Sequence, residues 1–272
     1  MLRNANTPFS YSQLSSYKTC PEKFKITYLD GVRKKHESIE SFVGKRVHSS
    51  LEWLYNKKNM NKAYITFDSL CEAYDEYWRN EWHDNIFIFN PIKNKKPYKT
   101  DFYYSMGKRC LSNYYEKYGP DFNQPVIGTE IELLFSVENH SFRGIIDRLD
   151  QIAPGKFMVH DYKTSKKQKT RRQGINDIQL GLYHIAIEQN YVDVNEISLR
   201  WHFLRHGTEV TIVYDKEALE KVKNKVIQII NKMSSSLDDN IFFPNETILC
   251  NWCYLWNECS VKFGDNTARR AK

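Results

Sequence analysis

Apolar residues in the first 120 positions recur at the spacing of α-helices. The pattern covers residues 9–29, 43–55, 67–82 and 102–118. The apolar positions in the first two ranges are Leu14, Tyr17, Phe24, Tyr28, Val43, Val47, Leu51 and Leu54. Steps of three, four or seven residues place side chains on one helix face. We therefore predict four helices, with an exposed loop at residues 90–100, which are rich in Pro, Lys and Asn.

In the middle of the chain the pattern changes to short runs rich in Val, Ile and Phe. These runs occupy residues 126–137, 142–152 and 157–162, and polar turns separate them at residues 138–141 and 153–156. β-Branched and aromatic residues between polar turns are typical of strands. The pattern predicts three consecutive antiparallel strands.

The last part of the chain combines both patterns. A helix is predicted at residues 177–189, strands at 197–205 and 209–214, and a long helix through the apolar positions of 219–233. Helices mixed with strands in this order indicate an α/β or α+β fold, with a central mixed β-sheet flanked by helices.

The chain contains no internal repeat, low-complexity tract or linker. With 272 residues, of which 41% are hydrophobic, it has enough apolar material for a large core. We expect one compact domain with three sections. Residues 1–124 form an N-terminal helical section, residues 125–240 form the core with the sheet, and residues 241–272 form a C-terminal cysteine segment.

Forty Lys and Arg against 33 Asp and Glu give a formal net charge of +7. This charge suits a polyanionic partner but does not require one. No apolar run approaches the ~20 residues that cross a bilayer, and the first residues do not resemble a signal peptide. We therefore expect no membrane contact and a cytoplasmic protein, either in a microbial cell or, if a virus encodes it, in the host cell.

Acidic residues interrupt two of the predicted strands. Asp147 lies in the sequence G-I-I-D-R-L-D, and the third strand ends with Asp161 and Lys163 in H-D-Y-K. Residues two apart on a strand share a face, so Asp161 and Lys163 project together, and ordinary hairpin register would set Asp147 beside them. Two carboxylates and an ammonium group can hold a hard divalent cation and act on a phosphodiester. A strand edge with solvated charges gives the same short pattern.

Further motifs accompany the two acidic strands along the chain. They are G-K-R-V-H at residues 44–48, D-Y-K-T at 161–164 and Q-L-G-L-Y at 179–183. Together they resemble the RecB-like branch of the PD-(D/E)xK nuclease superfamily, and the resemblance covers residues 12–259. It implies a restriction-endonuclease-like core. The proline of the superfamily's name is replaced by Ile146, which this branch commonly tolerates.

The resemblance also implies the roles of particular residues. The implied metal ligands are His48, Asp147, Asp161 and the Tyr162 carbonyl. The implied catalytic residues are Lys163, Asp161, Asp147 and Glu130. The implied cofactor is Mg²⁺ or Mn²⁺, and the implied reaction is hydrolysis of DNA phosphodiester bonds. Without the resemblance, His48 would be interpreted as an ordinary histidine in a helix. Glu132 lies on the same predicted strand face as Glu130 and is the alternative candidate for the role of Glu130.

Contacts with DNA are expected from two groups of residues. Gln179 and Tyr183 match the Q-x-x-x-Y helix motif of the branch, which lies beside the metal and touches nucleic acid. A basic run follows the third strand and consists of Lys166, Lys167, Lys169, Arg171 and Arg172. Such side chains bind phosphates without reading sequence, although a solvated loop has the same composition. A second basic loop contains Lys93, Lys95, Lys96 and Lys99.

Three of the six cysteines, Cys250, Cys253 and Cys259, fall within ten residues. Clustered thiols are typical of metal ligands. Cys20 lies in S-Q-L-S-S-Y-K-T-C-P-E-K-F, which resembles the opening motif of the iron–sulfur members of the branch, similar to the CRISPR-associated RecB-like exonucleases and the AddB nuclease domain. The resemblance implies a four-iron four-sulfur (4Fe-4S) cluster on these four cysteines. Zn²⁺ is the alternative, although zinc sites more often use paired C-x-x-C knuckles.

The remaining residues near the cysteines leave two interpretations open. Trp252, Tyr254 and Trp256 either stack unpaired bases or shield the cluster from solvent. Cys71 and Cys110, in the helical part, are interpreted as small buried hydrophobic residues.

The resemblance further implies an exonuclease that prefers single-stranded DNA, with 5′ to 3′ polarity favoured, in DNA repair, recombination, replication or CRISPR adaptation. The alternative is a non-catalytic DNA-binding or scaffold subunit of a helicase or of a CRISPR integration complex. The intact set of His48, Asp147, Asp161 and Lys163 argues against that alternative. No helicase P-loop of the type G-x-x-x-x-G-K-S/T occurs in the sequence, so a motor would be a separate protein.

Overall fold

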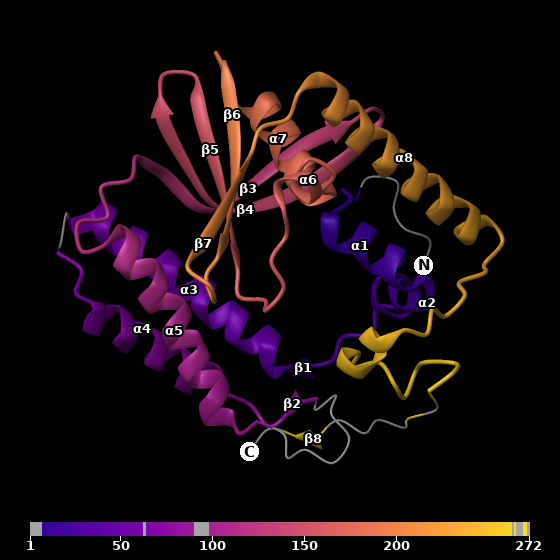
Figure 1. Ribbon diagram of the computed structural model, residues 1–272. Helices are drawn as coiled ribbons and strands as arrows, with labels where there is room; N and C mark the ends of the chain where they lie inside the picture. The colour runs from indigo at the N-terminus through magenta and orange to yellow at the C-terminus, as the bar shows by residue number, and fades with distance from the viewer. Residues whose placement is uncertain (1–6, 62–63, 90–97, 263, 265–268, 271–272) are drawn as a thin grey trace.

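A computed structural model of the protein describes residues 7–61, 64–89, 98–262, 264 and 269–270 (Figure 1). The helices are α1 (Tyr11–Thr19), α2 (Pro21–Phe24), α3 (Ile39–Asn61), α4 (Phe67–Glu81), α5 (Thr100–Tyr118), α6 (Arg171–Gly174), α7 (Ile178–Asn190) and α8 (Lys216–Asp238), with a π-helical turn η1 (Lys25–Leu29) and a 3₁₀ turn η2 (Ile248–Trp252). The strands are β1 (Glu37–Ser38), β2 (Ile86–Ile88), β3 (Val126–Val137), β4 (His140–Ala153), β5 (Lys156–Lys163), β6 (Glu196–Phe203), β7 (Thr208–Ile212) and β8 (Arg269–Arg270).

The main sheet has five strands in the order β3-β4-β5-β6-β7. Strands β5 and β6 are parallel, and the other neighbours are antiparallel. A parallel pair needs a crossover, which α6 and α7 supply between β5 and β6. The predicted run of three antiparallel strands and the predicted mixed sheet are therefore confirmed.

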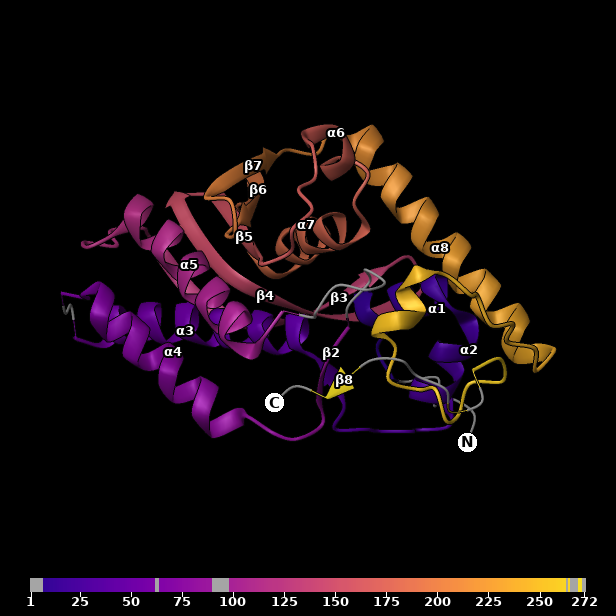
Figure 2. The ribbon, with the colours of Figure 1, turned by 60° about the horizontal axis from the view of Figure 1, so that its bottom comes forward.

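Helices cover the sheet from both sides. Helix α7 packs on one face, and α3 and α5 lie on the other, with α4 outside them (Figure 2). One apolar cluster fills the space between the sheet, α7 and α8 around Trp201 and Ile187. A second cluster joins α3, α4 and α5 around Leu51 and Leu111. The fold is the expected mixed α/β architecture of a sheet flanked by helices.

The predicted helix at residues 9–29 is wrong in one respect, because the chain breaks between α1 and α2. Cys20 has extended backbone angles, φ −161° and ψ 108°, and Pro21 follows it. The proline ring disfavours helical angles in the preceding residue, and proline is well tolerated in the first turn of a new helix. The break leaves Cys20 at a corner, outside the regular part of either helix.

Several short elements were not predicted. Strands β1, β2 and β8 form a small three-stranded sheet, and α6 lies within the expected basic run. Two to four residues are too few to show a hydrophobic period. Lys93, Lys95 and Lys96 of the second expected basic loop lie outside the described residues, and Lys99 is the N-cap of α5.

Helices α7 and α8 approach each other closely at Gly181. A Cβ atom at this position would lie 2.6 Å from Cγ1 of Val222, which is closer than real contacts allow. The glycine of the Q-L-G-L-Y motif therefore has a packing role. No helix in the described part of the chain is long and apolar enough to cross a membrane.

Candidate catalytic site

Three acidic residues form one row across β3, β4 and β5. The β3–β4 register pairs Thr129 with Arg148 and Ile131 with Ile146, which places Glu130 opposite Asp147. The β4–β5 register, extended by one residue, sets Asp161 on the other side of Asp147. Glu130 has a left-handed backbone, with φ 47°, which costs a residue with a side chain about 1–2 kcal/mol. Such strain is often found at functional positions.

His48 of α3 reaches the same row from a different layer. Its Nε2 donates to the Tyr162 carbonyl oxygen at 2.9 Å, and its Nδ1 lies 3.5 Å from Oδ2 of Asp147. Ligand atoms of His48, Glu130 and Asp147 all lie within 4.8 Å of one another. The structure thus brings together His48, Asp147 and the Tyr162 carbonyl, as expected, and Glu130 joins them more closely than the sequence indicated.

Gly44 explains how α3 comes so near the end of β5. A Cβ atom at Gly44 would lie 3.2 Å from Oγ1 of Thr164, a tight contact. The position one turn further along α3 is His48, which then faces the strand ends. The glycine of the G-K-R-V-H motif therefore allows the close approach of α3 that brings the histidine of the motif to the site.

The crowding of charges perturbs the titration of these groups. Desolvation and the neighbouring Asp147 carboxylate raise the pKa of Glu130 to about 7. Burial raises the pKa of Asp161 to about 6, although Lys163 opposes the change. Burial alone would lower the pKa of His48, but the Asp147 carboxylate outweighs it and raises the pKa to about 9. The site therefore concentrates negative charge that a cation would relieve.

The donor set fits a hard divalent cation. Carboxylate and carbonyl oxygens are the ligands that Mg²⁺ and Mn²⁺ prefer, and imidazole is tolerated by Mn²⁺. Asp147 is held in place because the Tyr162 backbone N–H donates to its Oδ2 at 2.7 Å. Among the described residues, the side chains grouped closely enough to hold the ion are those of His48, Glu130 and Asp147, and the Tyr162 carbonyl lies beside His48. The expected ligand Asp161 is not part of this group, and its carboxylate pairs with Lys163.

Lys163 stands beside this group, and side chains on both sides fix its position. Its Nζ lies 2.6 Å from Oδ2 of Asp161 and donates to Oε1 of Gln179 at 3.2 Å. The Gln179 Nε2 in turn donates to the Tyr183 hydroxyl at 2.9 Å. Burial would lower the pKa of Lys163, but Asp161 raises it above the usual value. The side chain is therefore a positioned ammonium group.

Tyr183 differs from its expected role in contacting DNA. Its side chain is buried, with 7% of its surface exposed, and its hydroxyl faces Gln179. Little of it is left for a nucleic acid to touch. In the structure the Q-x-x-x-Y motif supports Lys163 from α7.

Ion pairs hold two of the charged residues that the sequence singled out. Arg143 pairs with Glu132 at 2.5 Å on the exposed face of the sheet, so Glu132 does not compete with Glu130 for the site. Lys169 pairs with Asp177 at 2.7 Å and also lies over the ring of Trp201. The rest of the basic run projects into solvent and consists of Lys166, Lys167, Arg171 and Arg172.

The four cysteines expected to hold a cluster line one cavity of about 270 Å³. Cys20 comes from the corner between α1 and α2, and Cys250, Cys253 and Cys259 come from η2 and the segment after it. Four thiols around one space are a donor set that fits an iron–sulfur cluster or zinc.

Aromatic residues enclose this cavity. Trp252 and Trp256 line it and pack edge-on against Phe89 and Phe87. These contacts favour the shielding role over base stacking. Elsewhere, Cys110 is fully buried, as expected, whereas Cys71 is only partly buried.

Arg148 is a buried residue for which the sequence indicated no role. The side chain is completely buried, with 0% of its surface exposed. An arginine next to Asp147 in an otherwise apolar stretch was the available signal, but its partners come from distant helices.

Comparisons with known proteins bear on the family and the fold. The sequence matches the PD-(D/E)XK nuclease superfamily over residues 8–260. The chain is similar to a solved protein from Eubacterium rectale named as a candidate exonuclease, with a TM-score of 0.54 and 13% identity over 96% of this chain and 93% of that one. It also matches the crystal structure of SSO0001, with a TM-score of 0.35 and 14% identity over 89% and 95% of the two chains. No curated protein matches.

The structural likeness shows the fold, in agreement with the expected restriction-endonuclease-like core. The family match spans nearly the whole chain and includes every residue of the candidate site. The chain belongs to the PD-(D/E)XK nuclease superfamily.

Proposed function

We propose that the protein is a metal-dependent deoxyribonuclease of the RecB-like branch. The observation that carries the proposal is the row of Glu130, Asp147 and Asp161 beside His48 and Lys163. Mg²⁺ or Mn²⁺ bound to this row supplies activation of water and stabilisation of negative charge on the phosphate.

The residues of the chain have distinct tasks in this reaction. Lys163 neutralises charge that develops on the scissile phosphate, and its ammonium group is already held by Asp161 and Gln179. Glu130 assists as a further carboxylate next to Asp147. Because Lys163 has fixed partners on both sides, little reorganisation is needed when a phosphate arrives.

Replacing Gln179 by alanine should lower kcat by about 10-fold or more, as loss of an orienting partner commonly does. The KM for DNA should stay nearly constant, because Gln179 bonds to Lys163 rather than to the DNA backbone. Single-turnover cleavage over a range of DNA concentrations separates the two constants. Gln189→Ala is the matched control, since Gln189 lies on the same helix but bonds to the main chain of Ser136. Equal losses in both variants would contradict this role.

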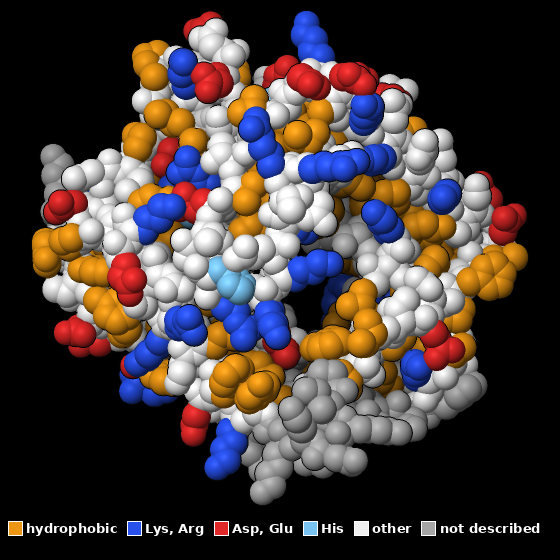
Figure 3. All heavy atoms as spheres, viewed as in Figure 1, with side chains coloured by type: hydrophobic (Ala, Val, Ile, Leu, Met, Phe, Trp, Pro, Cys, Tyr) orange, Lys and Arg blue, Asp and Glu red, His pale blue; other side chains and the backbone are white. Residues whose placement is uncertain are grey.

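The proposed substrate is a single strand with a free end. Figure 3 shows a hollow near the middle of one face, with Lys and Arg side chains on its margin. A cavity of about 660 Å³ between α1, α6 and the start of the C-terminal segment is lined in part by Lys18, Lys169 and Arg172. A basic, partly enclosed path favours a flexible strand over a stiff duplex.

The exposed lysines after β5 are proposed to hold backbone phosphates. Replacing Lys166 and Lys167 together by alanine should weaken binding of single-stranded DNA and lower the salt dependence of log Kd by about 0.7 per lost contact. Cleavage at saturating DNA should change little, because neither side chain belongs to the metal site. Fluorescence anisotropy at several salt concentrations measures the slope. The double variant of Lys221 and Lys223 on α8 is the control, and an equal change there would mean a general charge effect.

The form of attack is proposed to be exonucleolytic, with 5′ to 3′ polarity favoured. Linear single-stranded DNA labelled at either end, together with a closed single-stranded circle, tests this proposal. We expect the circle to resist cleavage and the 5′ label to appear first in short products. Rapid cutting of the circle would show an endonuclease instead, but it would not contradict metal-dependent hydrolysis. The biological setting proposed is DNA repair, recombination, replication or CRISPR adaptation, with a helicase or integration proteins as partners.

The cysteine cavity is proposed to hold a 4Fe-4S cluster, with Zn²⁺ as the alternative. Burial raises the pKa of the Cys253 and Cys259 thiols, so a bound metal would have to displace their protons. Hydrolysis needs no electron transfer. The cluster would therefore join the corner at Cys20 to the C-terminal segment as a structural link.

A further inference from the structure

A buried polar network lies on the face of the sheet opposite the carboxylate row. Neighbouring residues of a strand point to opposite faces, so Arg148 is directed away from the site that Asp147 enters. The guanidinium Nη1 donates to the hydroxyls of Tyr55 at 2.6 Å, of Tyr114, and of Tyr162 at 3.3 Å. These three tyrosines belong to α3, α5 and β5. One side chain of β4 thus holds both covering helices and the next strand.

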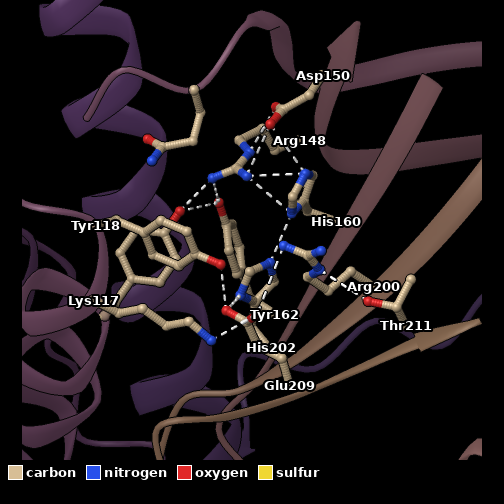
Figure 4. A network of polar contacts seen from close by, with 12 residues as sticks. Lys117, Tyr118, Arg148, Asp150, His160, Tyr162, Arg200, His202, Glu209 and Thr211 are labelled. Carbon is tan, nitrogen blue, oxygen red and sulfur yellow. Dashed lines mark hydrogen bonds and ion pairs between the residues drawn. The ribbon is translucent and has the colours of Figure 1, made fainter. Parts of the chain in front are cut away.

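The other side of the guanidinium faces charged and aromatic partners (Figure 4). The Arg148 Nε lies 2.9 Å from Oδ1 of Asp150, and Nη2 donates to Oδ2 at 3.1 Å. The Nη2 also lies 2.9 Å from the ring nitrogens of His160. From there the network continues through His202 to Glu209 on β7. A guanidinium removed from water is tolerated only when partners of this kind surround it.

Tyr162 belongs to this network and to the metal site at once. Its hydroxyl contacts Arg148 and, at 3.4 Å, Tyr114. Its backbone N–H donates to Asp147, and its carbonyl oxygen accepts from His48. The side chain therefore anchors the strand on one face, while the main chain places two components of the metal site on the other.

We infer that Arg148 is a positioning residue for the metal site and acts through Tyr162. The guanidinium fixes the Tyr162 ring between α5 and β4, and this fixes the carbonyl and the N–H that orients Asp147. The planar fork of arginine meets three hydroxyls and a carboxylate at once, which a lysine ammonium group cannot reproduce. The inference rests on the proposed function, because it assumes that the Asp147 row binds a divalent cation.

The decisive variant is Tyr162→Phe, which removes the hydroxyl but keeps the ring and the main chain. We expect the Kd for Mn²⁺, measured by electron paramagnetic resonance without DNA, to rise about 10-fold, as for loss of an orienting partner. Cleavage at limiting Mn²⁺ should fall and recover at high Mn²⁺, with the KM for DNA unchanged. Arg148→Lys should raise the Kd for Mn²⁺ by a larger factor and should also lower the Tm.

Tyr118→Phe is the matched control, because it also removes a network hydroxyl, but one that contacts Glu209 rather than Arg148. We expect its Mn²⁺ affinity to equal that of the wild type. If Tyr162→Phe and Arg148→Lys both bind Mn²⁺ as the wild type does, the network is only structural. The inference is then wrong, while the proposed function stands. If the wild-type protein binds no Mn²⁺ at this site, the proposed function fails and the inference falls with it.

Discussion

Replacing Asp147 by asparagine is expected to reduce metal-dependent cleavage by at least about 10²-fold, the usual cost of removing one electrostatic group from such a site. Asp147 stands between Glu130 and Asp161 in the carboxylate row and also faces His48. An amide of the same shape can still accept the Tyr162 N–H bond, so the fold should be kept while the anionic ligand is lost. Single-turnover cleavage of end-labelled DNA measures the loss.

Glu132→Gln is the matched control for this variant. It neutralises a carboxylate on the same sheet, but one that pairs with Arg143 on the exposed face. We expect activity close to that of the wild type. If Asp147→Asn remained as active as this control, the assignment of the metal ligands would be wrong.

Replacing Cys20 by serine is expected to have the largest effect on stability. Cys20 brings the α1–α2 corner to the cavity lined by Cys250, Cys253 and Cys259, so its loss opens a link between segments about 230 residues apart in sequence. Structural metal sites contribute directly to the free energy of folding. We expect loss of bound metal and a Tm lower by on the order of 10 °C, since each lost kcal/mol shifts the Tm of a chain this large by about 2–4 °C.

Metal analysis and the visible spectrum accompany the thermal measurement. Cys71→Ser is the control, because Cys71 lies on α4, outside the cavity, and is partly exposed. Iron with broad visible absorption supports the 4Fe-4S cluster, and a colourless protein with zinc supports the alternative. A Cys20→Ser protein that keeps its full metal content would contradict the assignment of this ligand.

The large elements were predictable because each has a clear hydrophobic period. The strand at residues 126–137 and the helices that begin near 43 and 102 follow from their apolar spacing, and the structure confirms them. The break at Cys20 was a local effect of Pro21, which periodicity alone did not reveal. Strands β1 and β8 have two residues each, which is too short for any pattern.

The part of the candidate site that depends on spacing along one strand was predictable. Asp161 and Lys163 share a strand face, and the hairpin register places Asp147 beside them. The choice between Glu130 and Glu132 was not predictable, because a regular strand directs both to one face. The left-handed backbone at Glu130 and the ion pair of Glu132 decide it, and both depend on the folded structure.

The role of Arg148 could not be predicted either, for a different reason. Two of its three tyrosine partners, Tyr55 and Tyr114, lie on helices 93 and 34 residues earlier in the chain. Tyrosines are common in the sequence, with 18 in total, so no local pattern marks these two. Networks of this kind arise from tertiary packing and become visible only in the structure.

The most direct test of metal-dependent DNA hydrolysis at this site uses purified protein freed of divalent ions. End-labelled single-stranded DNA is incubated with Mg²⁺, with Mn²⁺ and with a chelator, beside an Asp161→Ala variant. We expect cleavage with either ion, none with chelator, and almost none by the variant. Cleavage that persists in chelator, or a fully active variant, would contradict metal-dependent hydrolysis at this site.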